Sequence, residues 1–212
     1  MILDTMNEHI MKIIVASRPV DSINAIAQRI GLSYGWTYKW VKELEKRDVF
    51  CLTRKNAFLQ EHARFYKETI TYIHSVFSKN VRFHYEILSL FGIQYSFTKT
   101  DAVFLWTRGG YNIARSQNHY PIFIKVVKKN KKIFEYYCNK LGITSKNNVF
   151  YSVTYVDVIE KAIIDDIPVD SLDETMQFMQ ENKYNFLPAI EMIEQQYGKK
   201  KTVKYKEVVT NV

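Results

Sequence analysis

The segment Ile23–Arg47 reads INAIAQRIGLSYGWTYKWVKELEKR and contains two helical patterns separated by only three residues. Apolar residues repeat at helical spacing through its first eight positions, and Gly31 is a typical residue to end that helix. Ser33 is a plausible N-cap for a second helix, which we expect over residues 33–47. Two helices joined by so short a turn are typical of a helix-turn-helix.

The expected helix 33–47 has two different faces. Thr37, Val41 and Leu44 fall on one side and form the stripe that we expect to be buried. The opposite side is basic, and it carries Gly35, Lys39, Lys42 and Lys46. Tyr38 flanks this basic face on one side, whereas Trp36, Trp40 and Arg47 flank it on the other. The helix can therefore pack on a core and still present cations to a partner.

The flanking sequence completes a small domain. A helix is expected over residues 2–16, and Asp21 or Ser22 is expected to cap the helix that follows. Beyond residue 47, β-prone residues on either side of the turn 54–56 predict a hairpin over 49–60. The sequence therefore predicts a winged helix-turn-helix domain over residues 1–60.

Periodicity also divides the rest of the chain. A long helix is expected over 61–79. We expect residues 61–80 to link the two domains, or this helix to form a dimer contact. Strands and helices then alternate, so we expect residues 81–212 to form a mixed α/β domain and the whole chain to be α+β. The expected strands are 93–98, 102–107, 121–127 and 149–153, and the expected helices are 83–90, 131–141, 155–165, 171–182 and 186–197.

Composition and charge restrict the class of protein. With 47% hydrophobic residues, only 7 Gly and 4 Pro, and no apolar run long enough to cross a bilayer, the 212-residue chain is expected to be a globular cytoplasmic protein of two domains. The net charge of +8 favours polyanionic partners. Residues 81–150 carry eleven Lys and Arg against three Asp and Glu, so this part could extend a nucleic-acid surface or form a positive pocket.

The residues from Ile26 to Ser33, with Thr37, Val41 and Leu44-Glu45 after them, resemble the winged-helix transcription factors of prokaryotes. The resemblance covers about residues 10–60. Asp48 stands where that family usually has Gly before the wing. The resemblance implies that the helix 33–47 enters the major groove of double-stranded DNA while the wing lies on the backbone.

Within this interpretation, different residues have different roles. Lysines one turn apart suit phosphates, which give affinity and register, whereas side chains near the start of the helix would read bases. Trp40 is expected to pack mainly against the core, and a solvated surface is the alternative for the other residues. The expected DNA-binding residues are Ser33, Tyr34, Trp36, Thr37, Tyr38, Lys39, Lys42 and Lys46 on the helix, and Arg54 and Lys55 on the wing.

The second domain carries a coarser resemblance. Its order of elements, the segment from Ser96 to Ala102 and the stretch Val149–Ile164 are similar to the AbiE-type antitoxin regulators (the AbiEi component). This resemblance implies a degenerate nucleotidyltransferase-like or nuclease-like fold, autorepression of an operon, and neutralisation of a toxin or assembly with another protein.

No catalytic pattern supports an enzyme. The strand after Gly109-Gly110 lacks the paired carboxylates that two metal ions would need, and Asp165-Asp166 are adjacent and more suited to ending a helix. The five histidines show no metal-binding spacing, and the two cysteines are expected to be reduced thiols. We therefore expect a non-enzymatic, homodimeric regulator without cofactor or metal. A nucleotidyltransferase or nuclease targeted by the winged helix, and a protein-interaction module, remain alternatives.

Overall fold

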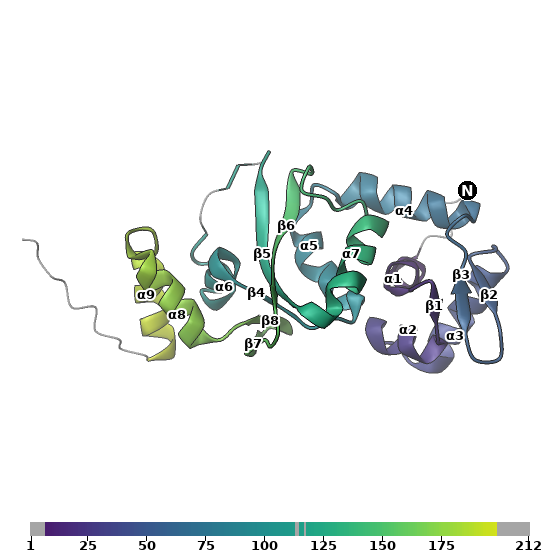
Figure 1. Ribbon diagram of the computed structural model, residues 1–212, viewed down its shortest axis with the longest axis horizontal. Coiled ribbons are helices and arrows are strands. Elements are labelled where there is room, and N and C mark those ends of the chain that lie inside the picture. The colour runs from purple at the N-terminus through teal and green to yellow at the C-terminus, as the bar shows by residue number, and fades with distance from the viewer. Residues whose placement is uncertain (1–6, 113–114, 117, 199–212) are drawn as a thin grey trace, which may run out of the picture. The chain divides into compact units, whose positions relative to one another are not determined.

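The computed structural model describes residues 7–112, 115–116 and 118–198, and this part of the chain is α+β with sheets of three and five strands (Figure 1). It divides into two compact units. Unit 1 comprises the chain up to Tyr95 together with Arg115–Ile159, and unit 2 comprises Ser96–Ala114 and the chain from Glu160. Over the described ranges, no helix has both the length and the apolarity to cross a membrane.

Unit 1 holds most of the helices and one complete sheet. Its elements are α1 (Glu8–Ala16), β1 (Val20–Asp21), α2 (Ile23–Ile30), α3 (Tyr34–Glu45), β2 (Phe50–Leu52), β3 (Ala57–Leu59), α4 (Arg64–Phe77), α5 (Val81–Ile87), the 3-10 helix η2 (Leu88–Phe91), β5 (Tyr120–Val127), the 3-10 helix η3 (Lys128–Asn130), α7 (Lys131–Lys140) and β6 (Val149–Val156).

The first three helices share one hydrophobic core with the hairpin β2–β3 and the start of α4. Ile13 and Ile14 of α1, Ile26 of α2, and Val41 and Leu44 of α3 are buried in it. The helix predicted over 2–16 is confirmed from Glu8 onwards, and its first residues lie outside the described chain. Burial of these apolar stripes, rather than helix propensity, stabilises helices as short as these.

Local signals set the turn between α2 and α3. Of the two expected caps, the structure uses Ser22, whose side chain accepts a hydrogen bond from the amide of Ala25 (3.1 Å). Gly31 ends α2 with φ +68°, a left-handed conformation that glycine adopts without strain. The helix predicted over 33–47 is confirmed as α3, two residues shorter at its C-terminal end.

The hairpin is confirmed, but its sheet contains a strand that the sequence did not reveal. β1 pairs antiparallel with β3, so that Val20 lies opposite Phe58 and Asp21 opposite Ala57. A two-residue strand next to Pro19 is too short to produce an alternating pattern, and pairing with β3 alone defines it. The sheet order is β1-β3-β2.

The basic middle of the chain folds against the N-terminal helices. β5 and β6 are parallel neighbours over their full length and are joined through α7. Figure 1 shows α7 beside α1, and Lys140 of α7 donates hydrogen bonds to carbonyl oxygens at the end of α1. The sequence predicts a boundary near residue 80, whereas these contacts place β5, α7 and β6 in the same unit as α1–α3.

Unit 2 takes segments from both sides of this insertion. Its elements are β4 (Tyr95–Phe97, of which Tyr95 belongs to unit 1), α6 (Lys99–Trp106), β7 (Lys161–Ile164), β8 (Ile167–Asp170), α8 (Leu172–Glu181) and α9 (Lys183–Tyr197). β4 pairs parallel with β8, and β7 pairs antiparallel with β8.

Two predicted elements of the second half are wrong. The apolar run predicted as a strand over 102–107 is helical and belongs to α6, which ends at Trp106. Neighbouring as well as alternate residues of this run are buried, so its apolar pattern fits a helix and a strand equally well. The helix predicted over 155–165 is replaced by the end of β6 and by β7. Asp165 and Asp166 do not end a helix: both have positive φ (48° and 65°) and form the two-residue turn between β7 and β8.

Candidate nucleic-acid interface

The N-terminal half of α3 is anchored from one side only. The side chain of Ser33 accepts a hydrogen bond from the amide of Trp36 (3.3 Å), so its hydroxyl caps the helix. Thr37, Val41 and Leu44 are fully buried, and the hydroxyl of Thr37 donates to the carbonyl of Ser33 (3.0 Å). Thr37, predicted as a DNA contact as well as a core residue, therefore belongs to the core.

Aromatic side chains on both flanks of the basic face of α3 are open to solvent. Tyr34 is 54% exposed, and Trp36 and Tyr38 are each 42% exposed, which is high for large side chains. Tyr34 and Tyr38 stack on each other one turn apart, with ring centroids 6.1 Å apart. Lys39 is also exposed and lies on the same half of the helix. We call Tyr34, Trp36, Tyr38 and Lys39 the α3 face.

Lys39 lies over indole rings rather than beside a carboxylate. Its Nζ is 4.9 Å from the centroid of Trp36 and 5.9 Å from that of Trp40. His9 of α1 completes the group, with its ring 5.8 Å from Trp36. Trp40 is half-buried and packs on the core, as predicted. These rings hold Lys39 in place without neutralising its charge.

The two lysines farther along α3 are in a different situation. Lys42 pairs with Glu45 (2.5 Å) and Lys46 pairs with Glu43 (2.7 Å). All four side chains retain substantial exposure, so each pair contributes little stability. Both lysines remain available to a phosphate, but each must exchange its carboxylate partner for it. The three lysines that the sequence treats alike are therefore not equivalent.

The hairpin presents two more cations. Arg54 and Lys55 are exposed at the tip between β2 and β3. Thr53 and Asn56 close this tip, since the amide of Thr53 donates to the carbonyl of Asn56 (2.8 Å) and the amide of Asn56 donates to the hydroxyl of Thr53 (3.1 Å). The turn residues are thus fixed by the backbone on both sides, and their charged ends are open to solvent.

Asp48 stands where winged-helix transcription factors usually have glycine, and its backbone conformation explains how the turn still forms. It has φ +60°, the left-handed conformation for which glycine is the usual residue. Asp is among the few other residues that adopt this conformation at moderate cost. The chain therefore makes the turn between α3 and β2 with Asp48 in the backbone geometry that a glycine would have.

The basic residues of the middle segment are dispersed. Lys128 pairs with Asp157 (2.8 Å), Lys131 lies 5.1 Å from the ring centroid of Tyr155, and Arg115 lies 4.6 Å from that of Tyr120. Tyr137, a candidate for base stacking, is fully buried. Each of these three cations therefore already has an intramolecular neighbour.

In the described residues, no three His, Cys, Asp or Glu side chains gather as metal ligands. His84 is fully buried, its Nδ1 lies 2.8 Å from the carbonyl of Asn80, and its Nε2 has no partner in the described chain. Burial lowers the pKa of His84, so its ring stays neutral near pH 7.

Comparison of the chain with protein families, with curated proteins and with solved structures found no match. The chemistry of the α3 face is therefore the basis for assigning a function.

Proposed function

We propose that the protein is a sequence-specific double-stranded DNA-binding regulator of transcription, built on a winged helix-turn-helix and without enzymatic activity. The observation that carries this proposal is the α3 face, on which Tyr34, Trp36, Tyr38 and Lys39 are exposed while the other side of the same helix is buried. A helix with one free side can enter the major groove, which is wide enough to admit it.

The proposed contacts follow from side-chain chemistry. Tyr34, Trp36 and Tyr38 stand near the start of α3, the part of a recognition helix that reaches base edges. Their rings offer apolar contacts to thymine methyl groups, and the tyrosine hydroxyls offer hydrogen bonds. Lys39 would bind a phosphate, and Arg54 and Lys55 would bind the backbone at the edge of the groove.

The arrangement of unit 1 is consistent with this role. The helices α1, α2 and α3 share one core with the hairpin, so α3 and the tip bearing Arg54 and Lys55 are supported by the same framework. The net charge of +8 adds a general attraction to polyanions. Within the proposal, the protein acts in the cytoplasm as a homodimer whose symmetry matches two half-sites roughly 34 Å apart.

An experiment with duplex DNA tests this function directly. The full chain is used to select sequences from a random duplex library, and the affinity for the selected duplex is compared with that for a shuffled duplex by fluorescence anisotropy. We expect a preference of at least about a thousandfold, the range typical of specific binders. Enrichment of no sequence above the starting library would overturn the proposal.

Matched variants localise the binding surface. Replacing Tyr34 and Tyr38 with alanine should weaken binding to the selected duplex by tenfold or more. Tyr184 on α9 is a suitable control because it is 92% exposed and also has a lysine beside its ring, Lys183 at 5.5 Å. Tyr184→Ala should leave the affinity unchanged. Equal affinities for the double variant and the wild type would exclude α3 as the reading helix.

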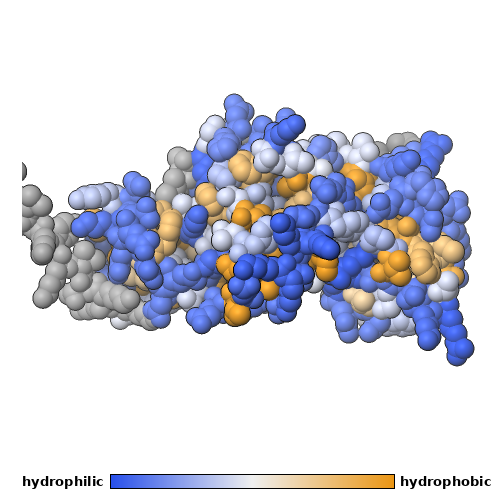
Figure 2. Space-filling model, viewed as in Figure 1, coloured by the Kyte–Doolittle hydropathy of each residue, from blue (hydrophilic) through white to orange (hydrophobic). Residues whose placement is uncertain are grey.

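The same exposed rings favour a second candidate, a protein-interaction module. Aromatic residues are enriched in protein interfaces, and the α3 face has three within two helical turns. Figure 2 shows that apolar residues on the viewed face form small groups among hydrophilic ones. Hydrogen exchange decides between the candidates, since added duplex DNA should protect residues 33–55 only if α3 binds DNA.

The proposed assembly extends to a partner. By its resemblance to AbiE-type antitoxin regulators, the protein would repress its own operon and neutralise a toxin through the part of the chain after residue 80. Co-expression with a toxin encoded beside it, followed by growth measurement, tests this role. Loss of growth with both proteins present would contradict it.

A further inference from the structure

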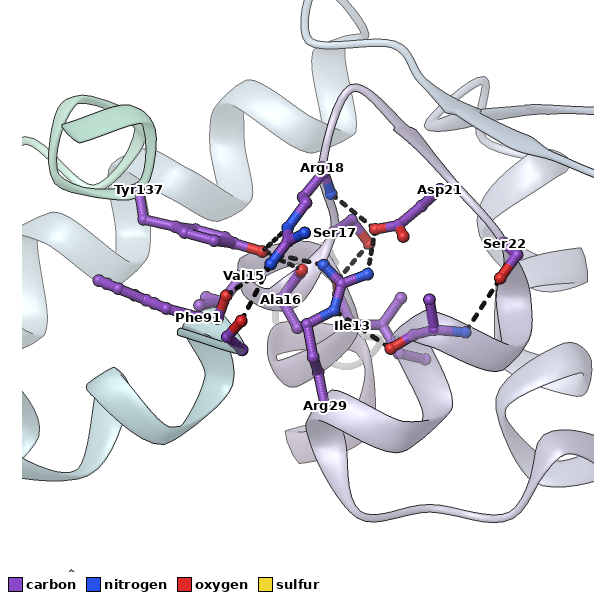
Figure 3. A network of polar contacts seen from close by, with 12 residues as sticks. Ile13, Val15, Ala16, Ser17, Arg18, Asp21, Ser22, Arg29, Phe91 and Tyr137 are labelled. Carbon is purple, nitrogen blue, oxygen red and sulfur yellow. Dashed lines mark hydrogen bonds and ion pairs between the residues drawn. The ribbon is translucent and has the colours of Figure 1, made fainter. Parts of the chain in front are cut away.

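A buried polar network joins α1 and α2 to α7 within unit 1, and Figure 3 shows it from close by. The hydroxyl of Tyr137 donates to the carbonyl of Ala16 (2.5 Å) and accepts from Nη1 of Arg29 (3.1 Å) and Nε of Arg18 (3.4 Å). Both guanidinium groups thus converge on one phenol. We call Arg18, Asp21, Arg29 and Tyr137 the Tyr137 network.

An open cleft borders this network. It is lined by Arg18, Ala25, Gln28, Arg29, Ser89 and Gly92, and its volume is about 360 Å³. One wall comes from α2, and the other comes from η2 and the residue that follows it. A volume of this size is at the lower end of the range for small-molecule sites.

Gly92 shapes the wall beside Arg29. It has φ +58°, and a Cβ built there would lie 2.7 Å from Cδ of Arg29 and 2.8 Å from Cγ. Only a residue without a side chain lets Arg29 lie across this point and reach Tyr137. The position of Arg29 at the border of the cleft therefore depends on its close approach to the backbone of Gly92.

The charge around the cleft is unbalanced. Arg18 and Arg29 are permanently cationic, and Asp21 is the carboxylate paired with Arg29. The side chains of Arg29 and Asp21 are only 8% and 7% exposed. Because Arg18 has no carboxylate partner in the described chain, the network carries one uncompensated positive charge at the cleft wall.

Arg18 also retains hydrogen-bonding capacity. Its Nε donates to Tyr137, and its Nη2 donates to the carbonyls of Phe91 (3.0 Å) and Gly92 (3.3 Å). Over the described ranges, no group accepts from its Nη1, which leaves two N–H donors for a ligand. The exposed amide of Gln28 and the hydroxyl of Ser89 add polar groups to the same lining.

We propose that this cleft binds a small organic anion whose phosphate or carboxylate group pairs with Arg18, with the rest of the molecule lying along Ala25 and Gln28. An arginine held by other hydrogen bonds and left with free donors is preorganised for an oxyanion. The volume of the cleft exceeds that of a bare oxyanion, which favours a phosphorylated or carboxylated metabolite over a simple ion. This site does not depend on DNA binding by α3.

Isothermal titration calorimetry at pH 7 tests the site with the full chain and three probes: inorganic phosphate, AMP and citrate. We expect AMP or citrate to bind with Kd below about 1 mM, and inorganic phosphate to bind at least fivefold more weakly. Preference for AMP would identify phosphate as the recognised group, and preference for citrate would identify carboxylate. Absence of binding by AMP and by citrate at millimolar concentration would overturn the proposal, as would binding of inorganic phosphate as tight as theirs.

Two variants and a matched control localise the binding. Gln28→Glu places a negative charge on the rim of the cleft and should weaken binding of the preferred probe at least tenfold. Gln195→Glu makes the same change on an exposed residue of α9 and should leave binding unchanged. Arg18→Lys keeps the positive charge but removes the planar guanidinium group that can bind two oxygens at once, so it should also weaken binding. Unchanged affinity in Gln28→Glu, or an equal loss in Gln195→Glu, would place the ligand elsewhere.

Discussion

The ammonium group of Lys140, the last residue of α7, lies 2.7 Å from the carbonyl oxygen of Ser17, the C-cap of α1. It also donates to the carbonyls of Ile14 (2.6 Å) and Val15 (3.2 Å). The last carbonyl groups of a helix have no partner within the helix, and a cation there also interacts favourably with the helix dipole. A residue more than a hundred positions away thus completes the end of α1.

Removal of this lysine should destabilise unit 1. In Lys140→Met, three carbonyl oxygens lose their hydrogen-bond donor in a partly buried setting, so we expect the free energy of unfolding to fall by about 2–4 kcal/mol. Urea unfolding monitored by circular dichroism measures the change. Lys146→Met, on an exposed loop residue, is the control and should change stability by less than about 0.5 kcal/mol. Equal stability of the two variants would show that the three hydrogen bonds contribute nothing.

The same lysine should make stability depend on pH. Burial lowers the pKa of Lys140 to about 7, although nearby Glu61 and Asp21 favour the charged form. An unfolded lysine binds its proton near pH 10.5, so between pH 7 and about 10 the unfolded state binds more protons. The free energy of unfolding contributed by Lys140 therefore rises with pH across this window. Urea unfolding at pH 7.5 and 9.5 should show a larger increase for the wild type than for Lys140→Met; parallel behaviour would refute this assignment.

Asp48 provides a prediction about the turn after α3. Because its φ is +60°, Asp48→Ala should lower the free energy of unfolding by about 1 kcal/mol, the usual penalty for an ordinary residue in this conformation. Asp48→Gly and Asp48→Asn should cause no loss, since both residues tolerate the left-handed region. Thermal unfolding of the three variants measures the order. A greater loss in the glycine variant than in the alanine variant would rule out the conformational explanation.

The lysines of α3 should contribute unequally to DNA binding. Lys39 lies beside aromatic rings and forms no salt bridge within the described residues, whereas Lys42 is paired with Glu45. Lys39→Ala should lower the slope of log affinity against log salt by about one, as expected for one lost phosphate contact. Lys42→Ala should change it less, and Glu45→Gln should increase affinity by freeing Lys42. Anisotropy titrations at several salt concentrations test this order, and a larger effect of Lys42→Ala than of Lys39→Ala would reverse the interpretation.

His84 should make the protein sensitive to acid. Burial lowers its pKa in the folded state, so below about pH 6.5 the unfolded chain binds a proton that the folded chain does not. The free energy of unfolding therefore falls as the pH drops through this range. His84→Leu should show a smaller decrease between pH 7 and 5, whereas the exposed His62→Leu should behave as the wild type. An unchanged decrease in His84→Leu would exclude His84 as the sensing group.

Much of the N-terminal organisation was readable from residues close together in the chain. Gly31 predicted the end of α2, Ser33 predicted the start of α3, and the spacing of Thr37, Val41 and Leu44 predicted the buried side of α3. Such predictions work because caps, glycine turns and helical periodicity depend on neighbours within a few residues. The basic face opposite the buried stripe follows from the same periodicity.

Other features depended on contacts between distant residues. β1 exists because it pairs with β3, and the apolar run in α6 is helical although its pattern is equally compatible with a strand. The different environments of Lys39, Lys42 and Lys46 depend on which side chains each lysine contacts, and the sequence does not show these contacts.

The sequence by itself determined the two helices joined by a short turn, the basic middle segment and the side of α3 that faces the core. Only the tertiary structure decided that Arg18, Arg29 and Tyr137 meet, that Lys140 caps α1, and that a cleft lies beside Gly92. The physical reason is the range of the interactions. Helical periodicity and capping act over a few residues, whereas a buried charge is placed by partners that folding brings from more than a hundred residues away.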